Sequence, residues 1–375
     1  MAGIYIHIPF CKRRCAYCDF FSTTQGEAAA AYVDAVCEEL RLRKDYLGGD
    51  EVGTIYFGGG TPSQLSTPLL GKIIEVIYNI YKVRRDAEIT LEANPDDLTA
   101  DYLRSISSLP FNRLSMGVQT FSDEVLRLIG RRHTAEQAMA AFRRCRESGL
   151  LNISIDLMYG LPGQTLSSWQ HDLVTATSLR PEHISAYLLT YEEGTALWGM
   201  RERGSVREAD EELSAKMFDM LREHLGANGY EHYEISNFCL PGMHSRHNSS
   251  YWTGEKYLGC GAGAHSYDGV TRSWNVASLE RYVSSAMRGR PEHETETLDA
   301  TTRYNEFVIT SMRTLRGMPL DALRERFGRQ MFDYCMSMAA PHLERKTVEI
   351  VGGIMRLTAR GVFVSDDIMS DLLWV

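Results

Sequence analysis

The sequence predicts an α/β fold built around an open, parallel barrel of six strands. Short segments rich in β-branched and aromatic residues recur in the N-terminal half, with helix-like stretches between them. Their starts, at residues 4, 54, 88, 113, 153 and 183, are on average about 36 residues apart. That spacing suits a repeating unit of strand, loop, helix and return. Cysteine, glycine, proline and acidic residues follow directly after several of these segments, as expected where a barrel carries its functional groups.

The predicted barrel elements can be given in chain order. The strands cover Ile4–Ile8, Thr54–Phe57, Glu88–Glu92, Arg113–Val118, Ile153–Met158 and His183–Leu189. Between them, Ala28–Tyr46 and Leu69–Tyr81 carry Leu, Ile, Val and Tyr at helical spacing. A closed barrel of this type has eight strands, so six units predict a partial barrel with a lateral gap that another segment covers.

Beyond about residue 200 the βα rhythm ends. A charged amphipathic stretch, a strand-like segment and a glycine- and aromatic-rich segment follow, at Ala209–Leu225, Tyr230–Ser236 and Pro241–Tyr267. From Thr302 onward, two or three helices precede a predicted hairpin at Arg356–Ser365 and a last helix that ends near Leu373. We therefore predict a barrel at 1–200, a barrel extension at 201–300, and a smaller C-terminal α+β winged-helix-like domain at 301–375. We interpret this last domain as a packing or partner-binding module.

Composition narrows the class of protein. The chain has 40 Lys and Arg against 49 Asp and Glu, a net charge of −9, which argues against a nucleic-acid partner. No apolar run approaches the roughly 18 to 20 residues that span a bilayer. The apolar run Ala2–Phe10 precedes the basic residues Lys12–Arg14, the reverse of a signal peptide, so we predict a cytoplasmic protein. An acidic exterior with a covered barrel gap is compatible with a monomer or a homodimer.

Three of the eight cysteines, Cys11, Cys15 and Cys18, crowd into the loop after the first strand. Three soft thiolates suit a [4Fe–4S] cluster whose fourth iron stays open to a small molecule. A structural zinc site would normally add a fourth Cys or His, and a redox pair of Cys15 and Cys18 would leave Cys11 unexplained. Both alternatives stay open from the residues alone. The intervening Lys12–Arg14 are expected to lower the thiol pKa values.

The segment Tyr5-Ile-His-Ile-Pro-Phe-Cys11-x3-Cys15-x-Tyr17-Cys18 resembles the radical S-adenosylmethionine (SAM) signature, in the form found in the coproporphyrinogen III oxidase (HemN) family. Further resemblance, in the same order, lies in Gly58-Gly-Gly-Thr-Pro62, Glu92-x-Asn-Pro95, Arg113-Leu-Ser-Met-Gly-Val-Gln119 and Asp156-Leu-Met-Tyr-Gly-Leu-Pro162. The resemblance runs over nearly the whole chain.

The resemblance implies a cluster on the three cysteines, with SAM bound to its open iron and cleaved reductively to a 5′-deoxyadenosyl radical. It also implies a low-potential electron donor of the flavodoxin or ferredoxin type. The positions that match SAM-contacting residues of the family are Tyr5, Tyr17, Gly59, Gly60, Thr61, Glu92, Gln119, Arg131 and Asp156. Backbone groups, a hydroxyl and carboxylates suit the methionine and ribose of SAM. For Glu92 and Asp156, ion pairs at the barrel rim are the alternative.

Two features place the resemblance within one branch of the family. The porphyrin-forming oxidases continue their motif with a further cysteine, where this chain has Phe20. In addition, His247-Asn248-x-x-Tyr251-Trp252 resembles the motif of HemW-type haem chaperones. Imidazole and phenolate both ligate haem iron, and a Trp offers a flat apolar surface. His247 is the leading candidate haem ligand, and His244, Cys260 and His265 are further candidates. A different interpretation is that His247 is a structural histidine and that Tyr251 and Trp252 are aromatic residues of the core.

These features lead to three functional hypotheses. The first is a radical SAM protein that binds haem and transfers it to an acceptor haemoprotein. The second is an oxygen-independent oxidase that decarboxylates coproporphyrinogen III, which the absence of a cysteine at position 20 disfavours. The third is a methyl- or radical-transferase that uses haem as a substrate. The acceptor protein cannot be read from the residues.

Overall fold

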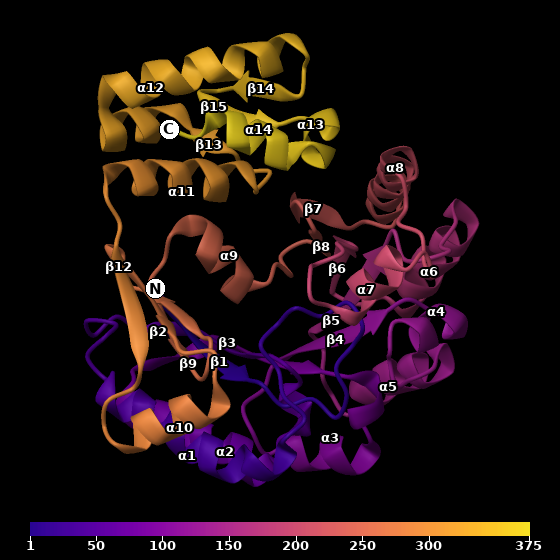
Figure 1. Ribbon diagram of the computed structural model, residues 1–375, viewed down its shortest axis with the longest axis vertical. Helices are drawn as coiled ribbons and strands as arrows, with labels where there is room; N and C mark the ends of the chain where they lie inside the picture. The colour runs from indigo at the N-terminus through magenta and orange to yellow at the C-terminus, as the bar shows by residue number, and fades with distance from the viewer.

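Six parallel strands, adjacent in chain order, form the wall of an open barrel in the computed structural model, which describes residues 1–375 (Figure 1). Their bounds are β1 Ala2–Ile8, β2 Val52–Gly59, β3 Val83–Ala93, β4 Arg113–Gln119, β5 Ile153–Tyr159 and β6 His183–Leu188. All six predicted strands are present, and the predicted α/β class with a partial barrel is confirmed.

The outer side of the barrel carries the helices that connect these strands (Figure 1). They are α1 Ala29–Leu42, α2 Thr67–Ile80, α3 Ala100–Ile106, α4 Asp123–Leu128, α5 Ala135–Glu147 and α6 Leu166–Leu179, with the short 3₁₀ turns η1 Gly26–Ala28, η2 Pro62–Gln64 and η3 Pro95–Asp97. The helix predicted over Ala28–Tyr46 ends earlier, at Leu42. Turns follow it, with Gly48 and Gly49 at positive φ.

Along each barrel strand, apolar and polar side chains alternate. Ile4, Ile6 and Ile8 of β1 are fully buried in the apolar core, whereas Tyr5 and His7 between them point to the barrel interior. Because side chains in a strand alternate between faces, the same rule gives the interior its other polar groups. They include Thr54, Tyr56, Glu88, Glu92, Arg113, Ser115, Ser154, Asp156, His183 and Ser185. The barrel interior is therefore a polar chamber, unlike the apolar core outside the wall.

The sheet continues past both ends of the barrel wall and reaches twelve strands. Beside β1 runs β9 Tyr257–Cys260, which is parallel to it, followed by β10 His265–Tyr267, β11 Thr271–Asn275 and β12 His293–Thr297. Beside β6 lie β8 Asn237–Cys239 and β7 Glu231–Glu234, both in antiparallel pairs. A seventh parallel strand thus lies in the segment predicted only as glycine- and aromatic-rich. The boundaries predicted at residues 200 and 300 stay predictions.

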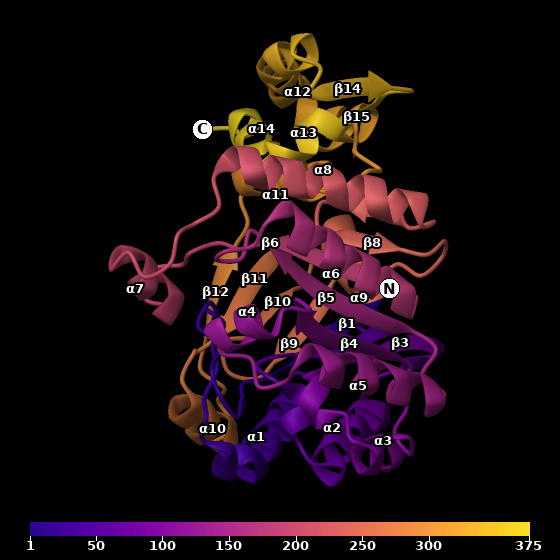
Figure 2. The same ribbon diagram turned by 90° about the vertical axis from the view of Figure 1, so that its right-hand side faces the viewer.

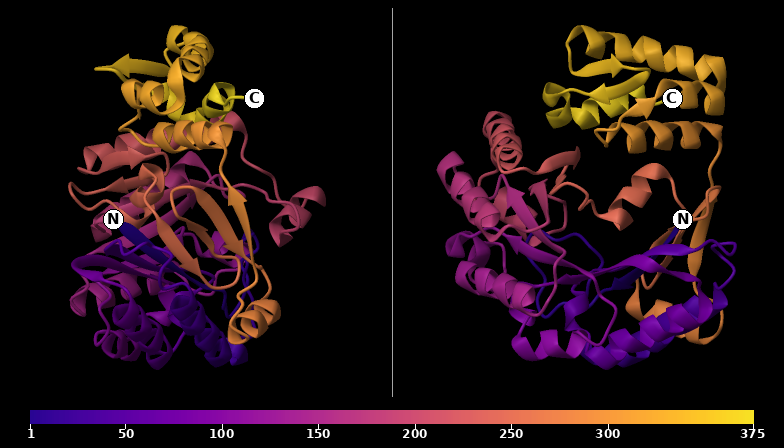
Figure 3. Two further views of the ribbon diagram at one scale, coloured as in Figure 1. Left: turned by 90° about the vertical axis from the view of Figure 1, so that its left-hand side faces the viewer. Right: turned by 180° about the vertical axis from the view of Figure 1, so that it is seen from behind.

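The open side of the barrel faces a helix and a small domain, as Figure 3 shows from behind. Helix α9, Arg246–Thr253, lies inside the arc of the sheet. The remaining connecting helices are α7 Ala196–Glu202, α8 Glu211–Ala227 and α10 Leu279–Met287. Helix α8 lies below the small domain in Figure 2. It contacts this domain through Phe218, whose ring centroid is 6.1 Å from that of Phe363. None of the helices has the length and apolar character needed to span a lipid bilayer.

The small C-terminal domain combines helices with a three-stranded antiparallel sheet. Its elements are α11 Ala300–Met312, β13 Met318–Pro319, α12 Leu320–Glu344, β14 Val348–Val351, β15 Ile354–Leu357, α13 Ala359–Phe363 and α14 Ser365–Leu372. Gly328, at φ +80°, divides α12 into two helical parts. The order helix, strand, two helices and a β-hairpin is that of a winged helix, as predicted.

The hairpin of this domain lies earlier than predicted. We expected it at Arg356–Ser365, but β14 and β15 turn at Gly352 and Gly353, whose φ angles are +59° and +78°. Two adjacent residues at positive φ are what a tight hairpin turn requires, and glycine supplies them without strain. After β15, Thr358 accepts a hydrogen bond from the N–H of Gly361 and begins α13. The last helix ends at Leu372, as expected.

Candidate cluster site and haem-binding groove

The loop after β1 holds the three clustered cysteines against the barrel. The Cys11 N–H donates to the carbonyl of Thr23 at 2.8 Å, and the Ala16 N–H donates to that of Ile129 at 2.9 Å. Cys11, Cys15 and Cys18 are half-buried, and no disulfide joins them. Three free thiols on an anchored loop are the donor set that a [4Fe–4S] cluster needs, so the residues fit this group.

The protonation of these thiols differs from our expectation. Burial raises the pKa of Cys18 to about 11, and burial also raises that of Cys11 against an opposing hydrogen bond from Thr61. The prediction that Lys12–Arg14 lower the thiol pKa values is therefore wrong for these two residues. Lys12 turns away instead and pairs with Asp97 at 3.1 Å. Desolvation outweighs the charge of exposed basic side chains, because water screens that charge.

The glycine run at the end of β2 brings its backbone close to β1. A Cβ on Gly59, which has φ +104°, would lie 2.5 Å from the His7 ring, and one on Gly60 would lie 2.7 Å from the backbone of Pro9. The Gly60 N–H already donates to the carbonyl of Ile8 at 2.8 Å. Thr61 completes the turn, and its Oγ1 lies 3.3 Å from the Cys11 sulfur. The run thus places a hydroxyl beside the first cysteine.

Two carboxyl groups from β3 and β5 face the barrel interior. Glu92 accepts a hydrogen bond from the Tyr56 hydroxyl at 2.6 Å, and burial raises its pKa to about 7. Burial likewise raises the pKa of Asp156 to about 6, against opposing effects of the Arg113 charge and of serine hydroxyls, one of them Ser115 at 3.3 Å. Neither carboxylate forms a direct ion pair. Both remain available to hydrogen-bond a polar ligand near neutral pH.

Arg131 links the cysteine loop to the strand ends. Its guanidinium donates to Asn94 Oδ1 at 2.6 Å and to the carbonyl of Gly117, and it approaches the Cys15 sulfur at 3.5 Å. Asn94 in turn donates to Thr61 Oγ1 at 3.4 Å. A half-buried cation so placed stabilises negative charge on a thiolate. We call Cys11, Cys15, Cys18, Thr61, Glu92, Asn94, Arg131 and Asp156 the cofactor rim.

The other residues predicted to contact SAM lie near this rim. Gln119 is buried and has φ +72°, a conformation that is unusual for any residue but glycine. Tyr17 packs, half-buried, against a small apolar cluster that includes Ile129 and Leu197. Tyr5 lies deeper in the barrel, where its hydroxyl is 3.1 Å from His7 Nδ1. The structure thus brings the predicted residues to one end of the barrel interior, with Tyr5 beneath them.

Helix α9 is fixed to the interior wall by its first turn. The Glu88 carboxylate accepts the N–H groups of Arg246 and His247, both at 3.0 Å, and Ser245 caps the same turn. His247 Nδ1 lies 2.8 Å from Thr54 Oγ1. A carboxylate at the positive end of a helix is favourable, and these backbone donors have no partner inside the helix. We call Glu88, Thr54 and α9 together the α9 platform.

His247 and Tyr251 share one face of α9, as their spacing predicts for a helix. The Tyr251 hydroxyl is 2.9 Å from His247 Nε2, so both ring nitrogens of His247 are engaged. His247 is 1% exposed, and burial lowers its pKa to about 3. A bond from His247 to iron would therefore require the Tyr251 hydroxyl to leave.

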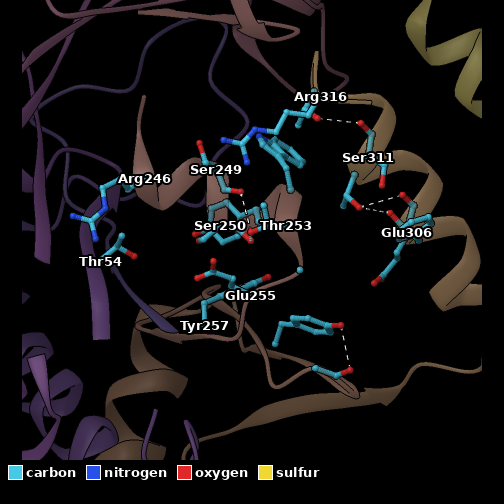
Figure 4. Close-up of a pocket in the computed structure, with 18 of the residues that line it drawn as sticks. Thr54, Arg246, Ser249, Ser250, Thr253, Glu255, Tyr257, Glu306, Ser311 and Arg316 are labelled. Atoms are coloured by element: carbon cyan, nitrogen blue, oxygen red, sulfur yellow. Dashed lines mark hydrogen bonds between the residues drawn. The ribbon is translucent and has the colours of Figure 1, made fainter. Parts of the chain in front are cut away.

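Tyr251 and Trp252 reach a large groove between the barrel and the C-terminal domain. This central groove has a volume of about 1760 Å³ and extends from Phe20 in the cysteine loop to Phe327 in α12. Figure 4 shows Ser249, Ser250 and Thr253 of α9 on one side, and Glu306 and Ser311 of α11 on the other. The volume exceeds the roughly 300–1,000 Å³ usual for small-molecule pockets.

The alternate haem ligands differ in access to this groove. His244 and His265 line it, whereas His247 and Cys260 do not. Cys260 is fully buried beside Glu39 in the core of the barrel wall, so it cannot reach a bound macrocycle. The arrangement leaves Tyr251, Trp252, His244 and His265 as the candidate contacts.

Three residues of the site have no distinct signal in the sequence. Asn94 contacts both Thr61 and Arg131, although its motif predicts only a resemblance to the family. Glu88 and Tyr56 lie in segments that predict strands and nothing more. Their roles depend on which strand neighbours which, information that no local pattern carries.

Comparisons with known proteins agree with this geometry. Residues 5–175 match the family model of the radical SAM superfamily, and residues 298–364 match that of the HemN C-terminal domain. The chain is 36% identical over 376 residues to the haem chaperone HemW of Bacillus subtilis, covering 100% of this chain and 99% of that protein. The chain belongs to the HemW family of radical SAM proteins. As for all radical SAM proteins, membership implies a [4Fe–4S] cluster and SAM.

Other members of the HemW family are similarly related. The haem chaperone HemW of Mycobacterium tuberculosis is 33% identical and covers 99% of this chain and 94% of its own. That of Escherichia coli is 36% identical, with 84% of each chain covered. Among solved structures, coproporphyrinogen III oxidase (HemN) of Escherichia coli superposes with a TM-score of 0.86 at 24% identity, over 99% of this chain and 89% of that chain. This last likeness establishes a shared fold.

Proposed function

We propose that this chain is a cytoplasmic haem chaperone, which holds haem in the central groove and transfers it to an acceptor haemoprotein. The observation that carries the proposal is the groove itself, into which α9 presents Tyr251 and Trp252 beside the barrel opening. The HemW relatives, which are named haem chaperones, support the same function. The fold is shared with coproporphyrinogen III oxidase. The fold by itself therefore does not decide between a haem chaperone and an oxidase.

The groove has the chemistry that haem requires. Trp252, Phe307, Phe327 and Met331 offer apolar surface for the macrocycle. The haem propionates are carboxylates, and guanidinium groups bind carboxylates in bidentate fashion. Five arginines line the groove: Arg246, Arg272, Arg303, Arg316 and Arg326. Of these, Arg272 is paired with Glu306 at 2.8 Å.

Tyr251 is the member of the His247–Tyr251 pair that we propose as the iron ligand. Its side chain lines the groove, whereas His247 lies behind it and can accept a hydrogen bond from the phenol through Nε2. Burial raises the pKa of Tyr251 and lowers that of His247, so both are neutral before haem arrives. Ligation of iron by Tyr251 would release the phenolic proton to solvent through the groove, and His247, whose pKa of about 3 makes it a poor proton acceptor, acts as a positioning residue.

At the cofactor rim, we propose that Cys11, Cys15 and Cys18 hold the cluster and that Thr61, Glu92, Gln119, Arg131 and Asp156 orient SAM, with Tyr5, Tyr17, Gly59 and Gly60 around them. The cluster and SAM would supply one-electron chemistry fed by a flavodoxin or ferredoxin. Arg131 stabilises charge on Cys15, and Asn94 fixes Arg131 relative to Thr61. Glu92, with its raised pKa, can exchange a proton near pH 7.

A haem titration of the purified chain tests this function. We expect Trp252→Ala to weaken ferric haem binding by at least about tenfold, since an aromatic side chain contributes about 1.5–3 kcal/mol when buried. The matched control is Trp198→Ala, because Trp198 lies on α7 and does not line the groove. Equal affinity for all three proteins would overturn the groove as the haem site.

Two further measurements separate ligand and activity. Tyr251→Phe should shift the Soret band of the ferric complex, whereas His247→Gln should weaken binding with a smaller spectral change; the reverse result would assign His247 as the ligand. Anaerobic incubation with SAM, reductant and coproporphyrinogen III should yield no decarboxylated porphyrinogen by mass spectrometry. Protoporphyrinogen formed over many turnovers would make the chain an oxidase despite Phe20.

A further inference from the structure

Three side chains of types that can ligate a metal, those of Glu231, Cys239 and His244, meet where β7 and β8 extend the sheet beyond the barrel wall. Glu231 on β7 lies opposite Cys239 on β8 in the antiparallel register. Residues directly opposite each other in such a pair project to the same face, so the carboxylate and the thiol share a side of the ribbon. The third side chain is that of His244. None of these three residues belongs to the cofactor rim or to the α9 platform.

A tight turn returns His244 to this pair. The Met243 N–H donates to the carbonyl of Leu240 at 2.9 Å, and Gly242 takes φ +79° after Pro241. Proline followed by a residue at positive φ is the pattern of a type II turn. The His244 ring then packs edge-on against Tyr233, with 4.6 Å between the ring centroids.

Tyr233 is itself held in place. Its hydroxyl is 2.7 Å from Nε2 of the buried His183, which also contacts Ser154 through Nδ1 at 2.7 Å. The wall against which His244 packs is thus fixed by hydrogen bonds across three strands. The imidazole is positioned by its surroundings and not by its own hydrogen bonds.

The ligand atoms of the three residues are close enough to share one ion. The Glu231 carboxylate oxygen, the Cys239 sulfur and an imidazole nitrogen of His244 all lie within 4.8 Å of one another. His244 Nε2 and Glu231 Oε2 are 4.0 Å apart, longer than a hydrogen bond. Cys239 is fully buried, whereas the Glu231 and His244 side chains are 53% and 35% exposed and can close on the sulfur.

We propose that Glu231, Cys239 and His244 bind a divalent metal ion, and that this ion is Zn²⁺. Thiolate, imidazole and carboxylate are the ligands of zinc, at about 2.0–2.3 Å. A simple Glu–His ion pair would involve two of the residues and would not account for the thiol within 4.8 Å of both. Binding forms a zinc–sulfur bond and releases the thiol proton to solvent.

Three protein ligands leave one coordination position open. Glu231 and His244 both line the central groove, whereas Cys239 lies behind them. The open position therefore faces the groove, where water or a carboxylate could occupy it. The site would stand whether or not the groove holds haem.

Zinc content of the cluster-loaded chain tests the proposal, because the cluster occupies Cys11, Cys15 and Cys18. After equilibration with Zn²⁺ and dialysis, zinc and iron are measured in one sample by elemental mass spectrometry. We expect one zinc per chain in the wild type, and loss of that zinc in Cys239→Ala and in His244→Ala. Cys335→Ala, which removes a buried cysteine of α12, is the matched control and should keep it.

X-ray absorption at the zinc edge gives a second readout that does not depend on folding of a variant. The wild type should show one sulfur neighbour at about 2.3 Å with nitrogen or oxygen at about 2.0 Å. Zinc without a sulfur neighbour, or equal zinc content in Cys239→Ala and the wild type, would overturn the site. So would a wild type that retains no zinc while its iron content shows an intact cluster.

Discussion

The cofactor rim and the α9 platform occupy the same barrel interior but are built in different ways. Each rim residue belongs to a barrel strand or to the loops and short helices that follow it, so the chain itself delivers the rim. The platform joins segments more than 150 residues apart, because Glu88 of β3 anchors the N–H groups of Arg246 and His247. Because the two sites share no residues, a substitution at one site should leave ligand binding at the other unchanged, and the following experiments test this.

The largest effect is expected at the rim. Cys15→Ala should abolish the iron–sulfur cluster, because two thiolates do not hold it, and should leave haem binding at the platform unchanged. Iron and sulfide content and the ferric haem titration measure the two sites separately. The control is Cys145→Ala, which removes a buried cysteine of α5. Joint loss of cluster and haem binding would show that the two regions are coupled.

The converse test removes the anchor of the platform. Glu88→Ala leaves two helix N–H groups without their carboxylate, and hydrogen bonds to a charged group contribute about 1.5–3 kcal/mol each. We expect a loss of about 3 kcal/mol or more in the free energy of unfolding, measured with urea, and weaker haem binding. The cluster content should not change. Glu75→Ala, at an exposed position of α2, should alter none of these values.

A third test uses the raised pKa of Glu92. Because its folded pKa, about 7, exceeds the ordinary value of 4.5, the folded chain binds the extra proton between these values. The stability of the wild type therefore falls as the pH rises from about 4.5 to 7, and Glu92→Gln removes this loss. The stability of the variant relative to wild type should increase by up to about 3 kcal/mol across that window.

Urea denaturation of SAM-free protein at about pH 5 and about pH 8 measures this difference. The amide of the Glu92→Gln variant keeps an oxygen to accept the Tyr56 hydroxyl, so the substitution isolates the charge. Equal pH dependence of the two proteins would mean that Glu92 ionises as an ordinary carboxyl and that the interior is well hydrated.

The smallest effect concerns the contact between His247 and Tyr251. A double-mutant cycle with His247→Gln and Tyr251→Phe should give a coupling of about 1 kcal/mol in the haem-free chain, the usual net value of one hydrogen bond. Cluster content again serves as the control for the rim. Zero coupling would mean that Tyr251 faces the groove without support from His247.

The sequence by itself determined the elements whose signal is local. Short segments rich in β-branched and aromatic residues, such as Ile4–Ile8, predicted each barrel strand, and the spacing of Cys11, Cys15 and Cys18 predicted a cluster site on one loop. The cysteine, glycine, proline and acidic residues directly after several strands predicted that the functional groups lie together at one end of the barrel. These features depend on neighbours within a few residues, so a pattern suffices to find them.

The tertiary structure alone decided what depends on distant partners. It turned the expected lowering of thiol pKa values into a rise, because burial of Cys11 and Cys18 outweighs exposed basic residues. It placed both nitrogens of His247 against Thr54 and Tyr251, and it added β9 beside β1. Burial and strand order arise only when remote segments pack together, and desolvation, the largest effect on these groups, has no local signature in the chain.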